Sequence, residues 1–312
     1  MSHRSPGEPR QVRVSVPATS ANLGPGYDTL GLALDLRDDV TVGTVEPGAA
    51  AGPTISIDVS GEGADDVPRD HTHLIARTVH HVFDWIGFPQ PCLTIATVNA
   101  IPHGRGLGSS AAAIVAGVAA ALALADPSAP LDRDRVLQIA AELEGHPDNV
   151  APCVFGGLTV AWTEPGGSAH AVVLVPTDWR PVVILPAERL ATHAARALLP
   201  ATVAHGVAAE NVARVALLVA VLTGQAPLEH LLAATQDGLH QPFRAGAMPV
   251  AAALLTDLRA VGIPAVVSGA GPSLLAFIRG DAELDRCLGT VDGRAKVLRL
   301  DVDRHGLLVR VP

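Results

Sequence analysis

Apolar and polar residues alternate along the first part of the chain in the pattern of strands that bury one face. Four such segments, VRVSVPAT, LGLALDL, VTVGTV and TISIDVS, lie between residues 11 and 60, with Gly- and Pro-containing turns between them. Residues 71–86 instead carry apolar residues at helical spacing, and Asp70 is the candidate N-cap. The sequence of residues 92–99 predicts a further strand. This region therefore predicts a sheet accompanied by a helix.

The rest of the chain mixes both periodicities. The alanine-rich segment 109–125 strongly favours a helix, and 132–144 predicts a second one with Asp132 as its cap. Further strands are expected at 155–163, 171–175, 181–185, 263–268, 273–278 and 295–302, and further helices at 188–198, 207–222, 228–234 and 247–261. The first half is too rich in hairpins for a doubly wound sheet, so the pattern predicts an α+β fold.

The turn-rich segment EPGGSAH at 164–170 marks the expected junction between two domains. We expect a disordered tail over residues 1–10, an N-terminal domain over 11–165 that carries a glycine-rich loop, and a C-terminal domain over 166–312. Only 3% of the 312 residues are aromatic, so Val, Leu, Ile and Ala must build both cores.

Charge and cysteine usage narrow the function class. A formal net charge of −9 argues against a nucleic-acid-binding surface. No run of ~18 uninterrupted apolar residues predicts a membrane span, and the polar start MSHRSPGEPR lacks the apolar core of a signal peptide. Cys92, Cys153 and Cys287 lie far apart and fit neither a metal site nor a disulfide framework. We therefore expect a cytoplasmic protein.

Residues 101–113, IPHGRGLGSSAAA, carry the clearest chemical signal. Gly104, Gly106 and Gly108 allow a tight loop whose N–H groups point inward, directly before a helix start that favours an anion. The two serines that follow could hold a phosphate oxygen or Mg²⁺. The loop lacks the lysine of a Walker A motif, and its glycine spacing differs from the dinucleotide fingerprint. The alternative is an ordinary glycine turn before a buried helix.

Three other segments combine glycine with polar residues: PATSANLGPGYDTLG at 17–31, ELEGHPDNVAPCVFGG at 142–157 and VVSGAGPSLLAFI at 266–278. Each segment alone could be a turn in which Asx side chains bond their own backbone. In order, however, the segments Pro17–Asp28, Pro102–Ala111 and Ser268–Ser273 resemble the three motifs of the GHMP kinases. The resemblance covers about residues 15–280 and implies a ribosomal-protein-S5-like N-terminal ATP-binding domain and a ferredoxin-like C-terminal GHMP domain.

Within this superfamily, EGHPDNVAP at 144–152 is similar to the homoserine kinase branch, whereas mevalonate and galactose kinases have a glycine-rich segment that ends in aspartate. The resemblance implies ATP-dependent phosphorylation of the hydroxyl of L-homoserine, a step of threonine biosynthesis, with Mg²⁺ as cofactor and a possible homodimer. A kinase for a mevalonate- or shikimate-like alcohol stays open. So does a catalytically silent member that binds a metabolite, although the intact loop serines and Glu144 argue against it.

The resemblance also assigns residues to the ATP phosphates and the metal. Ser110 and Glu144 would hold Mg²⁺, and Glu142 is the rival of Glu144. The residues expected to bind ATP are Pro102, His103, Gly104, Arg105, Gly106, Leu107, Gly108, Ser109, Ser110, Ala111, Ala112 and Thr192.

The expected homoserine pocket is polar, and two arginines are suited to its carboxylate. An asparagine, Asn149, stands where sugar and mevalonate kinases place a catalytic aspartate. We therefore expect the substrate hydroxyl to attack directly, oriented by Asn22 and Asn149, with Asp28 or Asp148 taking the proton late. Asn22, Asp28 and Asn149 are thus the catalytic candidates. The substrate-binding candidates are Asn22, Asp28, His146, Asp148, Asn149, Arg196 and Arg244.

Overall fold

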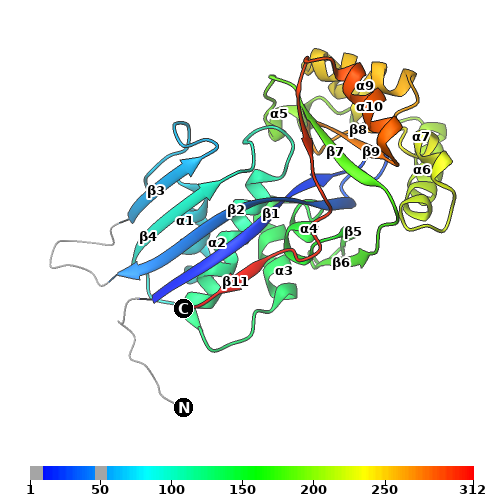
Figure 1. Ribbon diagram of the computed structural model, residues 1–312. Helices are drawn as coiled ribbons and strands as arrows, with labels where there is room; N and C mark the ends of the chain where they lie inside the picture. The colour runs from blue at the N-terminus through cyan, green and yellow to red at the C-terminus, as the bar shows by residue number, and fades with distance from the viewer. Residues whose placement is uncertain (1–9, 46–54) are drawn as a thin grey trace.

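The computed structural model describes residues 10–45 and 55–312. Residues 1–9 of the expected tail lie outside the described residues, and Arg10 begins the first strand. The chain forms two sheets with helices packed on them, which confirms the α+β class (Figure 1).

The larger sheet has seven strands and contains nearly all of the predicted N-terminal strands. Its main path is β11-β1-β2-β4-β3, and β5 joins β2 to β6. The segments LGLALDL and VTVGTV form one 16-residue strand, β2, which pairs with β5 near its start and with β4 near its end. The strands are β1 (Arg10–Ala21), β2 (Leu30–Val45), β3 (Ile55–Gly61), β4 (Cys92–Asn99), β5 (Leu158–Thr163), β6 (Ala169–Leu174) and β11 (Leu308–Arg310).

Four helices lie against one face of this sheet (Figure 1). They are α1 (Leu74–Ile86), α2 (Ser109–Ala125), α3 (Arg133–Glu144) and α4 (Val150–Phe155). The central helix α2 is buried on almost every side, and Gly117 lets α1 approach it, because a Cβ there would lie 2.8 Å from Thr78. Asp132 caps α3 as predicted, accepting from the N–H of Arg135. Asp70 does not cap α1, which begins after His73.

The smaller sheet is antiparallel, with the order β10-β7-β9-β8. With its crossover helices it forms a β-α-β-β-α-β unit in the strand order of ferredoxin-like folds. Its two faces alternate: Val182 and Ile184 share a core with α9 and α10, whereas Val183 and Leu185 share one with α6 and α7. The strands are β7 (Arg180–Leu185), β8 (Ala265–Val267), β9 (Leu274–Ile278) and β10 (Lys296–Arg299).

Most helices of this part lie within or close to the predicted segments. They are α5 (Thr192–Ala197), α6 (His205–Leu222), α7 (Leu231–Ala234), α8 (Gln241–Arg244), α9 (Pro249–Ala260) and α10 (Asp281–Val291), with 3₁₀ turns at Leu228–His230 and Ala245–Ala247. By length and composition alone α6 could cross a membrane. However, it carries a Glu210–Arg214 ion pair and buries Leu218, Val221 and Leu222 in the same core as the smaller sheet.

Four elements were not predicted. The segment VAPCVF forms the short helix α4, and Pro152 is tolerated in its first turn, where no N–H donor is needed. Helices α8 and α10 and strand β11 were also missed. Both β6 and β11 belong to the larger sheet, so the smaller sheet begins with β7 and the chain's last strand returns to β1. The division at residue 165 and the S5-like assignment stay predictions.

Asp38 links the larger sheet to the start of the glycine-rich loop. Its carboxylate is buried at 6% exposure and accepts from the backbone N–H groups of Ala100 and Ile101 at 2.7 and 2.9 Å. Burial raises the pKa of Asp38 to about 6, although both hydrogen bonds favour the charged form. The folded state therefore binds this proton more readily than the unfolded state does.

We expect Asp38→Ala to lower the free energy of unfolding by roughly 2–4 kcal/mol, because two buried N–H groups lose their acceptor. Asp38→Asn keeps an accepting oxygen and should lose much less. Relative to Asp38→Asn, the wild type should lose stability as pH rises from about 4 through the raised pKa, since the unfolded state releases the proton first. Urea unfolding of the three proteins between pH 4 and 8 measures this. Equal stabilities of the alanine and asparagine variants would contradict it.

Candidate active site

The glycine-rich loop between β4 and α2 has the backbone that its sequence predicts. Gly104, Gly106 and Gly108 have φ values of 65°, 73° and 70°, in the region that favours glycine. Gly108 is also the N-cap of α2, and no side chain caps this helix end. The first N–H groups of a 17-residue helix are therefore left for a ligand.

The hydrogen bonds of the loop all run in one direction. Every carbonyl from residue 104 to residue 108 accepts from the protein, the donors being the N–H groups of Leu190, Ser273, Thr19 and Ala112 and the hydroxyl of Ser268. In contrast, within residues 10–45 and 55–312 no backbone N–H between His103 and Ser110 donates a hydrogen bond. The loop therefore presents free donors on one side, as an anion-binding nest does.

The third motif, the turn Ser268–Ser273 between β8 and β9, supports this loop from behind. The hydroxyl oxygen of Ser268 lies 2.6 Å from the carbonyl oxygen of Gly106 and 2.8 Å from the hydroxyl oxygen of Ser20. A Cβ on Gly106 would lie 2.2 Å from the Ser268 carbonyl oxygen. The two sheets thus meet at the loop, and their contact fixes its shape.

Ser110 and Glu144 meet as predicted, since the Ser110 hydroxyl donates to Glu144 at 2.9 Å. Burial raises the pKa of Glu144 and the hydrogen bond from Ser110 opposes this shift. A hydroxyl and a carboxylate oxygen are suitable ligands for Mg²⁺. Ser110 and Glu144 both line a cavity at the start of α2. Glu142, by contrast, is exposed and does not line this cavity. The geometry therefore favours Glu144 over Glu142.

The EGHPDN segment places three more polar side chains beside Glu144. His146 Nδ1 lies 2.7 Å from Asp148. Burial would lower the pKa of His146, but the contact with Asp148, assisted by Glu144, raises it above the ordinary value. Asn149 precedes α4, and its Oδ1 accepts from the Thr19 hydroxyl at 2.8 Å. Its amide nitrogen is left without a partner among the described residues.

The first motif faces this segment across the cavity. Asn22 and Asp28 both have positive φ, 69° and 55°. Both polar atoms of the buried Asn22 side chain are already bonded: Nδ2 donates to the Gly269 carbonyl and Oδ1 accepts from the N–H of Asp28. Asn22 therefore holds the first and third motifs together. Its predicted contact with the substrate hydroxyl stays a prediction.

Two arginines complete the wall. Arg196 forms a bidentate ion pair with Asp28, with both distances 3.0 Å. Arg244 is buried at 2% exposure and has no ion-pair partner in the part of the chain that the structure describes. Each guanidinium also lies over the Tyr27 ring, 5.7 and 5.6 Å from its centre. Tyr27 thus aligns the two groups that were predicted to bind a carboxylate.

These residues surround one cavity of about 170 Å³. The predicted residues that line it are Asn22, Asp28, Gly104, Gly106, Gly108, Ser109, Ser110, Glu144, His146, Asp148, Asn149, Thr192, Arg196 and Arg244. Sequence reasoning missed Tyr27, Leu190, Gly269 and Ala270 as lining residues. The signal for Tyr27 was its place beside Asp28 in the first motif.

The remaining predicted ATP-binding residues lie elsewhere. Pro102, Leu107 and Ala111 line neither this cavity nor its neighbour. Arg105 also lines neither, because its guanidinium donates to the carbonyl of Pro186. His103 and Ala112 line the neighbouring cavity instead.

This neighbouring cavity, of about 280 Å³, also opens at the start of α2 and shares Ser109 and Ser110 with the first. Its wall is mostly apolar, with Val67, Pro68 and Ile75 among its residues. Two buried atoms in its lining residues, His73 Nδ1 and Thr97 Oγ1, have no hydrogen-bond partner among the residues that the structure describes. Its size, its apolar wall and its unpaired polar atoms suit the base of a nucleotide whose phosphates reach the loop.

Comparison with known proteins agrees with this arrangement. The family model described as the GHMP kinases N terminal domain matches residues 73–157, which include the loop and the EGHPDN segment. The fold and the site thus define a GHMP-type kinase. A homoserine kinase of Streptomyces avermitilis is 49% identical over 300 residues, covering 96% of this chain and 95% of its own. The chain belongs to the homoserine kinase family.

Another relative and a solved structure are also described as homoserine kinases, and a further solved structure shares only the fold. A homoserine kinase of Clavibacter michiganensis is 52% identical, covering 86% of this chain and 83% of its own. The crystal structure of homoserine kinase from Cytophaga hutchinsonii superposes with a TM-score of 0.81 at 26% identity, covering 99% of this chain and 100% of that one. Mevalonate diphosphate decarboxylase from Enterococcus faecalis, with a TM-score of 0.71 at 12% identity and 98% and 100% coverage, shares the fold.

The crowding at Gly106 can be separated from backbone strain by comparison with Gly104, where a Cβ would meet nothing within 4 Å. Both positions have positive φ, so either alanine should cost about 1 kcal/mol of strain. Gly106→Ala should destabilise at least twice as much as Gly104→Ala and raise the KM for ATP, because the loop must move off the Ser268–Ser273 turn. Urea unfolding and steady-state kinetics measure this. Equal effects of the two alanines would show that the turn does not shape the loop.

Proposed function

We propose that this protein transfers the γ-phosphoryl group of ATP to the side-chain hydroxyl of L-homoserine. The single observation that carries the proposal is the glycine-rich loop: its carbonyls from 104 to 108 are all bonded inward, while its amides from 103 to 110 donate to none of the described residues and face a cavity with both an acidic and a basic wall. The free amides suit phosphates, and the paired charges suit a small zwitterion. The family relationship agrees with both requirements.

ATP is expected to bind along the start of α2. The free amides and the helix dipole would hold its phosphates, and the neighbouring apolar cavity would take its nucleoside. Ser110 and Glu144 would hold Mg²⁺, which neutralises charge on the β- and γ-phosphates when bound. The 2.9 Å contact between their oxygens supports this assignment, because both atoms are oxygen donors of the kind that Mg²⁺ binds.

The Asp28–Arg196 ion pair supports a zwitterionic substrate. Its two charges stand side by side at the cavity, with exposed fractions of 34% for Asp28 and 43% for Arg196. An amino acid brings an ammonium and a carboxylate one carbon apart, so it can replace each partner of the pair without leaving a charge unpaired. The ammonium would then face Asp28, and the carboxylate would face Arg196 and Arg244. Mevalonate and shikimate carry no ammonium and would leave Asp28 without a partner.

The hydroxyl of homoserine would then extend toward the EGHPDN segment. Asn149 supports this orientation, because within the described part of the chain its amide nitrogen has no partner, while Thr19 fixes its oxygen. Positioning of this kind suits a loose transition state, which depends more on alignment and charge than on a strong base. Transfer of the proton to Asp28 or Asp148, a cytoplasmic location and a homodimer stay predictions.

Measurement of ADP release with homoserine, mevalonate, shikimate and galactose as acceptors tests the function directly. We expect turnover with L-homoserine to exceed that with each other alcohol by at least about a hundredfold, since an acceptor without an ammonium cannot pair with Asp28. Comparable rates with mevalonate would favour a different alcohol, and no turnover with any of them would favour a silent binding protein.

The metal assignment has a matched control on the same helix, α3. Glu144→Gln should lower kcat by about a hundredfold and raise the Mg²⁺ concentration needed for half-maximal rate, because the metal loses its only protein carboxylate. Glu142→Gln alters an exposed side chain and should leave both values unchanged. Steady-state rates against Mg²⁺ concentration compare the two. If the Glu142 variant lost activity and the Glu144 variant did not, the assignment would be reversed.

A further inference from the structure

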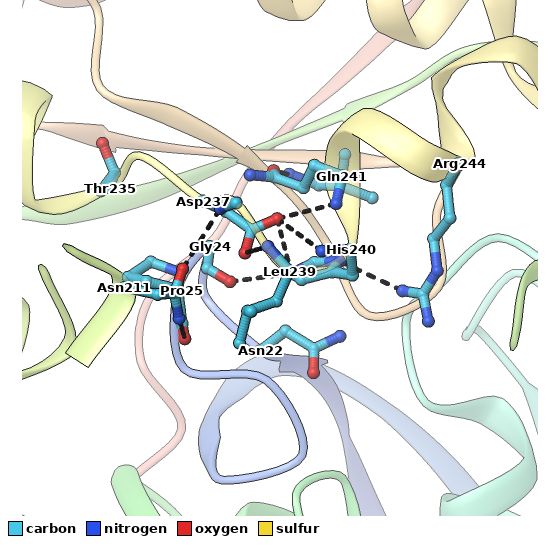
Figure 2. A network of polar contacts seen from close by, with 12 residues as sticks. Asn22, Gly24, Pro25, Asn211, Thr235, Asp237, Leu239, His240, Gln241 and Arg244 are labelled. Atoms are coloured by element: carbon cyan, nitrogen blue, oxygen red, sulfur yellow. Dashed lines mark hydrogen bonds and ion pairs between the residues drawn. The ribbon is translucent and has the colours of Figure 1, made fainter. Parts of the chain in front are cut away.

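The segment that precedes α8, Asp237–Gly238–Leu239–His240, forms a partly buried turn next to the candidate active site (Figure 2). One carboxylate oxygen of Asp237 accepts from the N–H groups of His240 and Gln241 at 3.0 and 2.7 Å, and the other from that of Leu239 at 2.8 Å. Asp237 and His240 have fully buried side chains. The turn therefore holds the His240 backbone in one place.

The partners of His240 determine which of its nitrogens carries the proton. Nε2 lies 2.8 Å from the Gly24 carbonyl oxygen and 3.5 Å from Asp237, and both of these can only accept. Nδ1 lies 3.2 Å from Nη1 of Arg244, which can only donate. These neighbours require a neutral imidazole with its hydrogen on Nε2 and its lone pair directed at the guanidinium. Figure 2 shows the contact between the imidazole and Arg244.

One edge of the Arg244 guanidinium is fully occupied by the protein. Nε donates to the Ala195 carbonyl at 3.2 Å, and Nη1 donates to His240 and to the Gly269 carbonyl at 3.3 Å. Nη2 has no hydrogen-bond partner among the described residues, and Arg244 lines the cavity. The bonded edge therefore leaves Nη2 as the end that is available to a ligand.

All of these protein partners are neutral. Arg196, on the same wall, is paired with a carboxylate, whereas Arg244 keeps its full positive charge within reach of the cavity. An aspartate in place of His240 would orient the guanidinium equally well but would neutralise it. A neutral acceptor orients the charge without competing with an anionic ligand.

We propose that His240 is a positioning residue that acts through Arg244: its Nδ1 lone pair fixes the guanidinium so that Nη2 faces the substrate carboxylate, and its Nε2–H anchors the arrangement to the first motif at Gly24. The inference rests on the proposed function, because it takes L-homoserine as the carboxylate-bearing substrate. It adds to that function a residue that touches neither ATP nor substrate yet sets the affinity for the substrate.

Two amide variants separate the two contacts of His240. His240→Asn keeps an acceptor near the position of Nδ1 and loses the donor to Gly24, whereas His240→Gln keeps a donor near Nε2 and loses the acceptor. We expect His240→Gln to raise the KM for L-homoserine about tenfold, the size of one charge-assisted hydrogen bond, with the KM for ATP unchanged. His240→Asn should stay within about threefold of the wild type.

A substrate without a carboxylate and a double variant show whether the effect passes through Arg244. With 3-aminopropan-1-ol, which is homoserine without its carboxylate, His240→Gln should leave the KM at the wild-type value. In an Arg244→Met background, His240→Gln should add no further increase for homoserine, because coupled positions are not additive. Equal losses on both substrates, or fully additive losses, would overturn the proposal and leave His240 a purely structural residue.

The outcome can be separated from that of the proposed function. Calorimetric titration of each protein with L-homoserine repeats the comparison without turnover, and thermal unfolding shows whether each variant is folded. A wild type that binds homoserine but does not phosphorylate it would overturn the function and leave the positioning role standing. A wild type that phosphorylates homoserine, with a folded His240→Gln variant of unchanged KM and Kd, would overturn the positioning role alone.

Discussion

The structure depends on one constraint, the division of the loop 103–110 into a bonded side and a free side. All five carbonyls from 104 to 108 accept a hydrogen bond, one of them from Ala112 at the start of α2 and the other four from Thr19 of β1, Leu190 and the Ser268–Ser273 turn. Because these four bonds come from segments distant along the chain, the loop has its shape only when both sheets are in place. The free amides on the other side are thus a product of the whole fold and not of the loop sequence alone.

The same division between used and available atoms recurs in the side chains around the cavity. Asn22 has both polar atoms bonded within the protein, whereas Asn149 has one bonded and one without a partner. One edge of the Arg244 guanidinium is hydrogen-bonded to the protein, and Asp28 and Arg196 form an ion pair with each other. The site is therefore rigid where it is bonded, and it presents only a few groups to a ligand, which is how a small pocket achieves specificity.

Much of this could be predicted from the sequence, because its strongest signals are local. Period-two alternation gave most strands, helical spacing gave α1, and the alanine-rich segment gave α2. The glycines of the loop have the positive φ they were expected to need. The Ser110–Glu144 contact followed from ordered motifs. The sequence could not show that Arg105 turns away to Pro186, or that Asn22 has no free atom, because these facts depend on segments distant along the chain.

Strand β11 is such a distant partner. It lies at residues 308–310 of 312 yet pairs with β1, the first strand described, while Arg37 of β2 forms an ion pair with Asp303 just before it. During synthesis β1 therefore leaves the ribosome well before the strand that covers it. Until then β1 exposes unpaired backbone groups that could pair with another nascent chain. Each newly made chain therefore has an unpaired stretch of β1 until β11 has been synthesised and pairs with it.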